Sequence, residues 1–502
     1  MVSARASLPV AVIGAGPVGL AAAAHLVERG LSYIVLEAGD QVAAHVSAWS
    51  HMRLFSPWVY NTDPAAVRLL AATGWQAPIP EELPTAAELV EQYLAPLAAH
   101  PAISPRIRYG ATVTSVRRRG LDRTKTRGRE EAPFVLRYAT SGGEREVLAR
   151  AVIDASGTYG TPNPLGADGV AALGEVELAD RIAYGIPDIL GADRDRYTGC
   201  RVVVVGSGHS AMHAIFDLAE LRRVAPRTAT DWAIRRDTGG ALFGGGSVDG
   251  LPARGGIGTR TRALVAAGIV SLRTGFATAA VRRVSGGIAL SDGDQEIGPY
   301  DEAIVATGFR PDLSMLGEVR LELDPALESP VRLAPLIDPN FHSCGSVPPH
   351  GHRELAHPEA NLYLVGAKSY GRAPTFLMRT GYEQVRSVVA ALAGDVASAE
   401  RVELVLPETG VCSSGERGAG EGCCGAGTAG ARGEPLSLLG PAIGRGRGDL
   451  TLTIPVTMPQ PAPSSEVASC GCGSTCCDGD PAHRPVTVAT ASRCCDDACC
   501  RG

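Results

Sequence analysis

The chain has no excess of positive charge, no second long apolar run, and almost no cysteine outside its C-terminal part. Its 47 Lys and Arg face 53 Asp and Glu, a formal net charge of −6, whereas nucleic-acid-binding proteins carry a basic domain or stripe. The apolar stretch 8–26 contains a glycine motif, and no other run approaches the about 20 apolar residues of a membrane span. These absences argue against nucleic acid and membrane as partners, and we expect a cytoplasmic protein.

Cysteine is scarce through the body of the chain, where residues 1–411 hold only Cys200 and Cys344. From about residue 408 the composition changes to Gly, Pro, Ser, Ala and Cys, with too few large apolar residues to offset the entropy of ordering. We expect 408–502 to be a flexible tail. In a reducing cytoplasm its clustered thiols indicate metal-binding or redox groups; the alternative is an extension without an essential role. The candidate metal ligands are the adjacent pairs Cys423, Cys424, Cys476, Cys477, Cys494, Cys495, Cys499 and Cys500.

A first glycine-rich motif, VAVIGAGPVG at residues 10–19, follows a short apolar strand and opens an Ala/Leu-rich helix. Gly14 permits the tight turn, Gly16 lets the backbone approach a pyrophosphate, and Gly19 lets the helix pack closely on the strand. Glu37 ends the next predicted strand, where a carboxylate accepts hydrogen bonds from ribose hydroxyls. We interpret this pattern as an FAD site; the alternative is an α/β unit that binds no nucleotide.

A second motif, VVVVGSGHSA at residues 202–211, lies in the same strand-to-helix context. The next predicted strand ends without an acid and is followed by Arg235 and Arg236. Arginines at this point suit the 2′-phosphate of NADPH through forked, charge-assisted hydrogen bonds; the alternative is a solvated strand end. The residues of the motif predicted to contact this cofactor are Gly206, Gly208, His209 and Ser210.

Together the motifs predict an α/β protein with two Rossmann-like dinucleotide-binding domains and a flexible tail. We expect an FAD domain in two parts, 1–198 and 299–407, with an inserted NADPH domain at 199–298 and the tail at 408–502. Val113 lies in a strand predicted to meet the adenine. Further cofactor contacts are predicted in small-residue turns that follow apolar strands, at Gly157, Gly308 and Gly366.

Three further segments are predicted to lie near the flavin or the nicotinamide. Residues 41–64 are crowded with aromatic side chains and form a loop over the flavin; the alternative is a packed surface loop. Residues 242–258 are glycine-rich and predicted to be a loop near the nicotinamide. Residues 374–393 are predicted to form a helix whose N-terminus stabilises the reduced flavin. The catalytic candidates in the first of these segments are Trp49, His51 and Arg53.

Several short runs carry a family resemblance: 53–58 (RLFSPW), 153–158 (IDASGT), 184–188 (YGIPD), 206–211 (GSGHSA), 304–312 (IVATGFRPD) and 368–376 (KSYGRAPTF). With the paired glycine motifs, the chain resembles flavin-containing monooxygenases and other pyridine-nucleotide-dependent flavoproteins. Over about residues 8–412 it is similar to the flavoproteins of bacterial arsenic-resistance operons, often called ArsO, which commonly end in cysteine-rich tails. The resemblance implies an FAD- and NADPH-dependent monooxygenase linked to arsenic resistance.

One departure concerns the F-x-G-x-x-x-H-x-x-x-[YF] signature of flavin-containing monooxygenases, because the corresponding stretch, 184–188 followed by Tyr197, lacks the histidine. The leading hypothesis is a monooxygenase that uses oxygen on a small, soft nucleophile, since the cofactor carries the hard step. A first alternative is an NADPH-dependent thiol, disulfide or metalloid reductase that works through tail cysteines, because no C-x-x-C follows either glycine motif. A second is a tail that binds trivalent arsenic or another soft metal, for which thiolates are suitable ligands.

Overall fold

The computed structural model describes residues 7–237, 241–244, 249, 251–341, 347–374 and 376–404. These residues belong to one compact unit, residues 1–420. The predicted tail, 408–502, and its candidate metal-ligating cysteines lie outside the described residues, and their role stays a prediction. Across the described ranges, no helix is both long and apolar enough to cross a membrane.

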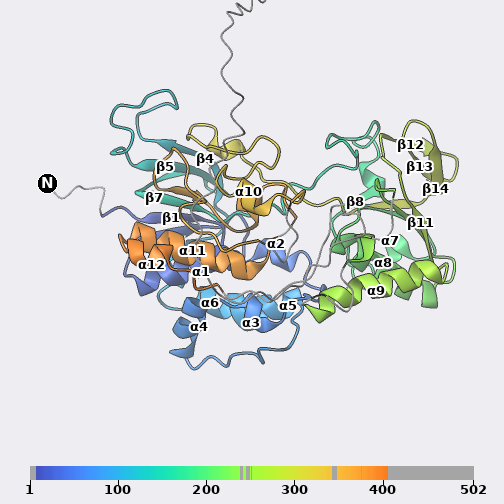
Figure 1. The fold of residues 1–502 in the computed structure, drawn as a ribbon, viewed down its shortest axis with the longest axis horizontal. Coiled ribbons are helices and arrows are strands. Elements are labelled where there is room, and N and C mark those ends of the chain that lie inside the picture. Colours follow the sequence, from blue (N-terminus) through green and yellow to red (C-terminus); the bar gives the residue numbers. More distant parts are fainter. Residues whose placement is uncertain are drawn as a thin grey trace, which may run out of the picture. The chain divides into compact units, whose positions relative to one another are not determined.

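A first parallel sheet carries the first glycine motif, and its strand order is β16-β7-β1-β2-β3. Helix α1 (Pro17–Glu28) follows β1, and helix α11 (Met378–Leu392) packs beside α1 on the same face of the sheet (Figure 1). We call this sheet with its covering elements the first lobe. Its strands are β1 (Val10–Ile13), β2 (Tyr33–Leu36), β3 (Ile107–Arg108), β7 (Ala151–Asp154) and β16 (Leu362–Leu364).

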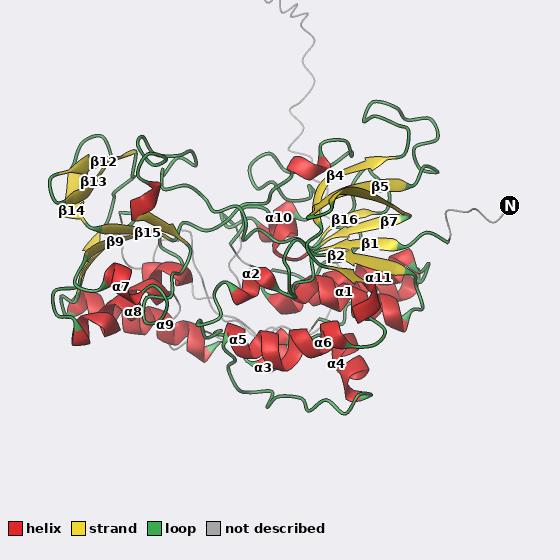
Figure 2. Ribbon diagram, turned by 180° about the vertical axis from the view of Figure 1, so that it is seen from behind, coloured by secondary structure: helices red, strands yellow, loops and turns green. Residues whose placement is uncertain are grey.

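Both faces of the first sheet are covered, as the unbroken apolar sequence of β1 requires. Side chains alternate along a strand, so Val10 and Val12 pack with α1 and α11 while Ala11 and Ile13 pack on the opposite face. An antiparallel meander covers that opposite face (Figure 2). Its strands are β4 (Thr112–Arg118), β5 (Phe134–Thr140) and β6 (Gly143–Ala149).

A second parallel sheet, of order β11-β10-β9-β15-β8, carries the second glycine motif. Val202 and Val204 of β9 pack with helix α8 (His209–Val224), and Val203 and Val205 pack toward a second antiparallel meander. Two strands of the parallel sheet, β8 and β15, lie on either side of the range 199–298 that was predicted for the second domain. We call this assembly the second lobe. Its strands are β8 (Ile182–Tyr184), β9 (Arg201–Val205), β10 (Ala229–Ala233), β11 (Val270–Arg273) and β15 (Glu302–Val305), with β12 (Ala280–Val284), β13 (Gly287–Ser291) and β14 (Glu296–Tyr300) in the meander.

Short helical segments connect these layers, and their ends follow ordinary capping signals. Asp63 accepts a hydrogen bond from the Ala66 N–H at 3.0 Å, and Thr85 forms a capping box with Glu88. The short α-helices are α2 (Ala44–Ser47), α3 (Trp58–Asn61), α4 (Pro64–Ala71), α5 (Ala86–Leu89), α6 (Ala95–Ala99), α7 (Arg194–Tyr197), α10 (Ala334–Ile337) and α12 (Val396–Glu400). A π-helical turn spans Val90–Leu94, and 3-10 turns span Ser104–Arg106, Ala179–Arg181, Ala241–Phe243, Ser314–Leu316 and Gly366–Tyr370.

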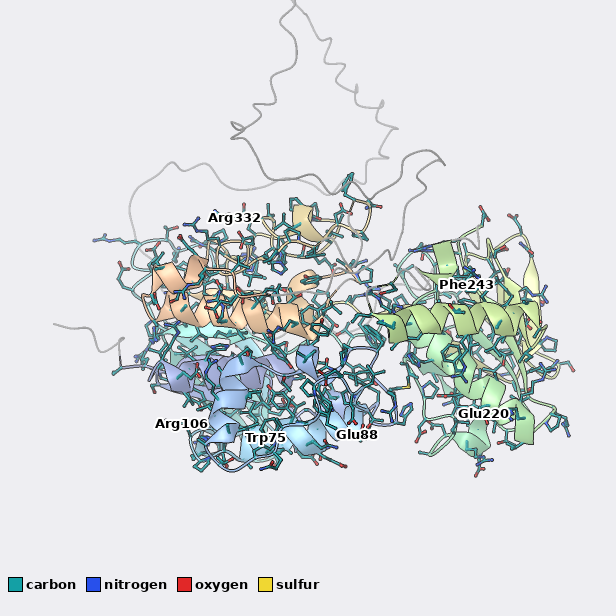
Figure 3. All side chains as sticks on the ribbon, turned by 60° about the horizontal axis from the view of Figure 1, so that its bottom comes forward. Trp75, Glu88, Arg106, Glu220, Phe243 and Arg332 are labelled. Carbon is teal, nitrogen blue, oxygen red and sulfur yellow. The ribbon has the colours of Figure 1, made fainter. Side chains whose placement is uncertain are left out.

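The predicted loop 242–258 is wrong in its second half, because helix α9 (Pro252–Ala266) begins there. Proline suits the first turn of a helix, and one glycine of α9, Gly258, serves close packing. A Cβ on Gly258 would lie 1.7 Å from the carbonyl oxygen of Phe243, so only glycine lets α9 approach that backbone (Figure 3). The glycine content therefore reflects helix packing at this position.

The predicted helix 374–393 starts later than expected, since α11 begins at Met378. Phe376 packs beneath the helix start, with its ring 5.3 Å from that of Tyr370, and a Cβ on Gly381 would lie 2.8 Å from the Phe376 ring. One face of α11 is apolar and carries Val385, Val388 and Val389, which are fully buried in the first lobe.

Acid should destabilise the first lobe through His357. Burial lowers the pKa of His357 to about 4, and its Nδ1 accepts from the Glu322 N–H at 3.3 Å. The folded protein therefore favours the neutral ring. The contribution of His357 to the free energy of unfolding is complete above the unfolded pKa of about 6.5 and is lost as the pH falls toward 4. We expect a loss of about 3 kcal/mol over that window.

Urea unfolding at pH 7, 5.5 and 4.5 measures this effect. In H357N the Asn Oδ1 can replace the Nδ1 acceptor without titrating, so the difference from wild type should change between pH 6.5 and 4. A constant difference across that window would show that His357 is not the responsible group.

Candidate functional site

The first glycine turn joins β1 to α1 at the carboxyl edge of the first sheet. Gly14 has φ +96°, and a Cβ there would lie 2.9 Å from the Ala155 carbonyl oxygen. A Cβ on Gly19 would lie 2.0 Å from the Gly14 carbonyl oxygen, so both glycines are required by packing inside the protein. Around Gly16 nothing lies within 4 Å of a Cβ, which leaves the space that a pyrophosphate needs.

The amino end of α1 carries no side-chain cap on Gly16 and no acidic residue in its first turn. Free N–H groups and the helix dipole at such an end favour an anionic group. The turn thus fits the diphosphate of a dinucleotide by both shape and charge.

Glu37 stands beside this turn at the end of β2, and it is only 8% exposed. Its carboxylate accepts from the Ala15 N–H at 2.5 Å and from the Gly39 N–H at 2.8 Å. A carboxylate has about four acceptor positions, so two remain for ribose hydroxyls. Its placement agrees with the predicted ribose contact.

Glu37→Gln should weaken FAD binding roughly tenfold, because the amide replaces one charged acceptor that is worth about 1.5 kcal/mol. Titration of the apoprotein with FAD, followed by flavin fluorescence, measures the change. Glu28→Gln is the matched control: Glu28 lies at the exposed end of α1 and pairs with Arg68. Equal affinity in both variants would contradict the ribose role of Glu37.

The second glycine turn repeats the first between β9 and α8. Gly206 has φ +127°, and a Cβ there would lie 2.3 Å from the Ala306 carbonyl oxygen. Nothing lies within 4 Å of a Cβ on Gly208. His209 and Ser210 begin α8 directly after this open position, so the predicted contacts surround a second helix N-terminus.

His209 is contacted by a segment that sequence reasoning placed in the other domain. The ring of Phe55 lies 5.2 Å from the His209 ring. Burial lowers the pKa of His209, and the charge of Arg254 lowers it further. The second nucleotide turn therefore presents a neutral imidazole against an aromatic ring from the loop 41–64. From the sequence, Phe55 was only one of several aromatic residues in 41–64, and its contact with His209 could not be predicted.

Arg235 and Arg236 are both exposed just beyond β10. One guanidinium nitrogen of Arg235 donates to the Ala167 carbonyl oxygen at 3.0 Å, which fixes part of this side chain. The two cations stand at the carboxyl end of the strand next to β9, where the ribose of a second nucleotide is expected.

The remaining predicted cofactor contacts follow strand ends. Gly157 has φ +71° after β7, and Gly366 has φ +67° after β16. Gly308 has φ +93° after β15. Its carbonyl oxygen accepts a hydrogen bond from the Asn163 N–H at 2.9 Å, so the segment after β15 pairs with the segment that contains Asn163. Val113 is half-buried in β4, opposite Tyr138.

The three catalytic candidates lie in different environments. Trp49 packs against the core of the first lobe. His51 is half-buried, and its Nε2 has no hydrogen-bond partner within the described part of the chain. Arg53 is exposed. Its guanidinium donates to the Leu83 carbonyl oxygen and lies 3.9 Å from the Glu88 carboxylate.

His213 lies on α8 of the second lobe, within electrostatic reach of His51 in the predicted loop. The pKa of His213 is lowered to about 4, mainly by burial and in smaller part by the charges of His209, Arg260 and His51. The predicted loop thus meets the helix that begins at the second glycine turn.

A buried charged cluster at the edge of the first sheet was not predicted. Lys368 lies 2.7 Å from an Asp154 carboxylate oxygen and donates to the Ser156 hydroxyl at 2.9 Å. Asp154 ends an apolar strand, β7, and Lys368 lies in the 3-10 turn four residues after β16, which is the only trace of the cluster in the sequence.

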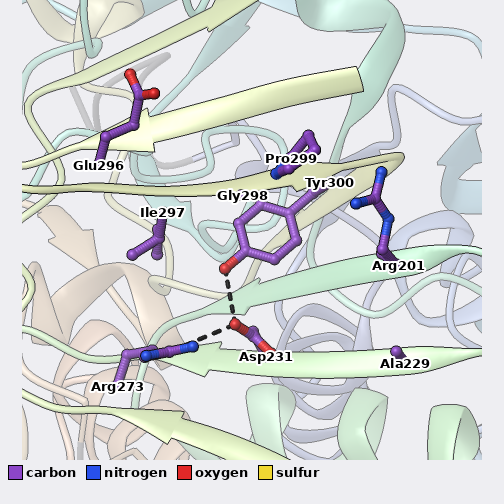
Figure 4. A pocket seen from close by; sticks show the side chains of 9 residues that line it. All are labelled: Arg201, Ala229, Asp231, Arg273, Glu296, Ile297, Gly298, Pro299 and Tyr300. Atoms are coloured by element: carbon purple, nitrogen blue, oxygen red, sulfur yellow. Dashed lines mark hydrogen bonds and ion pairs between the residues drawn. The ribbon is translucent and has the colours of Figure 1, made fainter. Parts of the chain in front are cut away.

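A cavity of about 320 Å³ lies apart from both glycine turns, in the second lobe. The Tyr300 hydroxyl donates to Asp231 at 2.8 Å, and Arg273 approaches the same carboxylate at 3.4 Å (Figure 4). Burial and this hydrogen bond raise the pKa of Tyr300. The cavity includes Arg201 and Ala229, the first residues of β9 and β10, whereas nucleotides bind at the carboxyl ends of such strands.

Within the described ranges no three His, Cys, Asp or Glu side chains come together as a metal site. Cys200 is the only cysteine among the described residues, and its thiol contacts the Arg196 carbonyl oxygen at 3.3 Å, beside the start of β9. Burial raises the pKa of the Cys200 thiol, so it is a poor nucleophile at neutral pH.

Comparisons with known proteins agree with this geometry. Residues 11–230 match the family described as pyridine nucleotide-disulphide oxidoreductase. The indole-3-pyruvate monooxygenase YUCCA1 of Oryza sativa subsp. japonica is 29% identical over 215 residues, which are 41% of this chain and 44% of that protein. The chain therefore spans less than half the length of this curated relative.

Two solved structures share the fold. The bacillithiol disulfide reductase Bdr (YpdA) from Bacillus cereus gives a TM-score of 0.55 at 18% identity, over 77% of this chain and 99% of that one. The cadaverine monooxygenase DfoA from Erwinia amylovora, bound to FAD, gives 0.53 at 13% identity, over 80% and 98%.

The fold and the two glycine turns are those of two Rossmann-like dinucleotide-binding domains. The predicted fold class is confirmed. The predicted pyridine nucleotide agrees with the name of the family matched over residues 11–230, and DfoA, which shares only the fold, is bound to FAD.

Proposed function

We propose that the chain is an NADPH-dependent FAD monooxygenase acting on a small, soft nucleophile such as a trivalent arsenical, with its NADPH domain at 199–298. The proposal rests on the two glycine turns in one compact unit, each open at the glycine that a pyrophosphate would approach. Two nucleotide sites in one chain suit hydride transfer from one cofactor to the other. A relative over part of its length is named a monooxygenase.

Each lobe contributes a distinct binding task. FAD, when bound, supplies the redox and oxygen chemistry. The amino end of α1 and Glu37 would hold its diphosphate and ribose, and the amino end of α8 would hold the diphosphate of NADPH. Trp49 and His51 are proposed to exclude water from the reacting atoms. Arg53 would act only after leaving its present contacts.

The arginines after β10 support NADPH rather than NADH. Arg236→Ala should raise the KM for NADPH roughly tenfold and leave that for NADH unchanged, because one charge-assisted contact to the 2′-phosphate contributes about 1.5 kcal/mol. Steady-state oxidation of both nucleotides measures the ratio. Arg223→Ala, on the exposed face of α8, is the control. A parallel change for both nucleotides would place Arg236 outside the phosphate site.

The rival proposal is a reductase that passes electrons to thiols of the tail. One observation bears on this reductase proposal. Cys200, the single described cysteine, lies at the start of β9 and not at either glycine turn. A dithiol for this reaction would therefore come from residues beyond the described part of the chain. The tail could also bind trivalent arsenic directly, since thiolates suit soft metals.

The deciding experiment follows NADPH oxidation by the FAD-loaded full chain with and without oxygen and with a trivalent arsenical. Oxygen-dependent oxidation stimulated by the arsenical, with an oxygenated product, supports the monooxygenase. Anaerobic oxidation that disappears when the eight paired tail cysteines are changed to serine supports the reductase. Failure of NADPH to reduce the flavin under either condition would overturn both.

A further inference from the structure

The buried cluster of Asp154, Ser156 and Lys368 lies at the carboxyl edge of the first sheet. The Lys368 ammonium is 2.7 Å from one Asp154 oxygen, and these side chains are 1% and 0% exposed. The Ser156 hydroxyl donates to the other Asp154 oxygen at 2.7 Å and accepts from Lys368 at 2.9 Å. The Ser156 N–H also donates to Asp154 at 3.1 Å. One ion pair and two hydrogen bonds thus link the three side chains in a closed ring.

This cluster adjoins the turns predicted to surround FAD. Asp154 ends β7 and pairs in register with Leu364 of β16, whose following 3-10 turn carries Lys368. The Gly14 turn lies directly against the cluster, because a Cβ on Gly14 would lie 3.1 Å from the Ser156 Cα. The ion pair therefore joins the ends of two strands and fixes the turn that contains Ser156.

Stability alone does not account for an ion pair in this position. Removing two charges from water costs free energy that their attraction often fails to repay, so neutral replacements of a buried pair are often as stable. Lys368 is only 1% exposed, so it is also too buried to reach solvent or a ligand directly. What the pair does provide is a fixed direction for the Ser156 side chain and backbone.

We propose that Lys368 is a positioning residue for FAD: paired with Asp154, it holds the Ser156–Gly157 turn in the conformation that receives the cofactor. Lys368 acts through Ser156 and not by touching FAD. The inference rests on the FAD site of the proposed function. It states that the affinity of this site for FAD depends on Lys368, a residue that does not contact the cofactor. It predicts that FAD binding depends on the pair even where folding does not.

The test is a double-mutant cycle on the full-length apoprotein, read as the dissociation constant for FAD. One arm replaces the pair together, Asp154→Asn with Lys368→Met, because a single replacement would leave an uncompensated buried charge. The other arm is Ser156→Ala. Removing the pair should weaken FAD binding at least about tenfold, and Ser156→Ala about fivefold. If Lys368 acts through Ser156, the triple variant should bind within about twofold of the pair variant.

A matched control neutralises a second buried ion pair. Arg254 and Asp249 lie 2.8 Å apart in the second lobe, each with a side chain 2% exposed, and Asp249→Asn with Arg254→Met should leave FAD affinity unchanged. Thermal unfolding of every apoprotein separates affinity from folding. Weak FAD binding by the pair variant at an unchanged Tm supports the positioning role.

Three results would overturn the inference: FAD affinity of the pair variant within twofold of wild type, effects that multiply in the triple variant, or an affinity loss that only follows the loss in Tm. None of these depends on NADPH. If wild type binds FAD but NADPH fails to reduce it, the proposed function fails while this cycle still decides the role of Lys368.

Discussion

Gly206→Ala should slow the reduction of bound flavin by NADPH roughly 100-fold and leave FAD binding intact. A Cβ at this position would lie 2.3 Å from the Ala306 carbonyl oxygen and 2.7 Å from its carbonyl carbon. Both atoms are backbone at the end of β15, so no side-chain rotation relieves the overlap. The backbone φ of +127° is also unfavourable for any residue with a Cβ.

The size of this effect follows from two costs. A left-handed backbone costs about 1–2 kcal/mol for an L-residue, and overpacking against a rigid neighbour costs about 1–3 kcal/mol. A total of about 3 kcal/mol corresponds to a roughly 100-fold loss in the rate of flavin reduction at low NADPH. Stopped-flow measurement of flavin absorbance under anaerobic conditions gives that rate.

Gly268→Ala is the control for this variant. Gly268 lies just beyond α9 in the same lobe with φ +65°, but nothing lies within 4 Å of its Cβ. It carries the same kind of backbone strain without the overlap. If Gly268→Ala slows reduction as strongly as Gly206→Ala, general weakening of the second lobe is the cause and the nucleotide turn is not.

Gly14→Ala should produce the opposite pattern, a protein that fails to retain FAD. A Cβ there would lie 2.9 Å from the Ala155 carbonyl oxygen and 3.1 Å from the Ser156 Cα, at a φ of +96°. The turn must then move away from β7, which displaces the amino end of α1 from the diphosphate. We expect FAD affinity to fall roughly 100-fold, from about 3 kcal/mol of combined strain and overlap.

Flavin content after gel filtration and FAD titration of the apoprotein measure this loss. Gly30→Ala is the control, since Gly30 ends the same helix with φ +62° and open space around its Cβ. Normal FAD content in Gly14→Ala would remove the first glycine turn as the flavin site. The two glycine variants together assign one cofactor to each lobe.

Much of the first nucleotide site could be predicted from the sequence because its signals are local. Gly14, Gly16 and Gly19 act within one strand-turn-helix unit, and the strand predicted to end at Glu37 corresponds to β2 (Tyr33–Leu36). The place of Glu37 next to the turn followed from that strand alone. Parallel strands in a Rossmann unit fix these neighbours, so spacing along the chain translates directly into space.

Other features could not be predicted, because they depend on segments brought together from far apart in the chain. The glycines of α9 suggested a loop, and only the structure shows that one of them, Gly258, allows the close approach to Phe243. Arg53 is the clearest case among the catalytic candidates, since its direction was set by Glu88 and the Leu83 carbonyl oxygen. No periodicity in the loop 41–64 carries that information.

The sequence by itself determined two dinucleotide-binding units, the strands that carry them and the charges that follow those strands, because each is written in residues a few positions apart. Only the tertiary structure decided that Lys368 pairs with Asp154 and that Phe55 covers His209. The physical reason is that these partners meet only when the packing of the whole sheet buries them side by side. An ammonium behind a strand must meet whichever carboxylate the neighbouring strand brings to the same edge, and that neighbour is selected by the packing of the whole sheet.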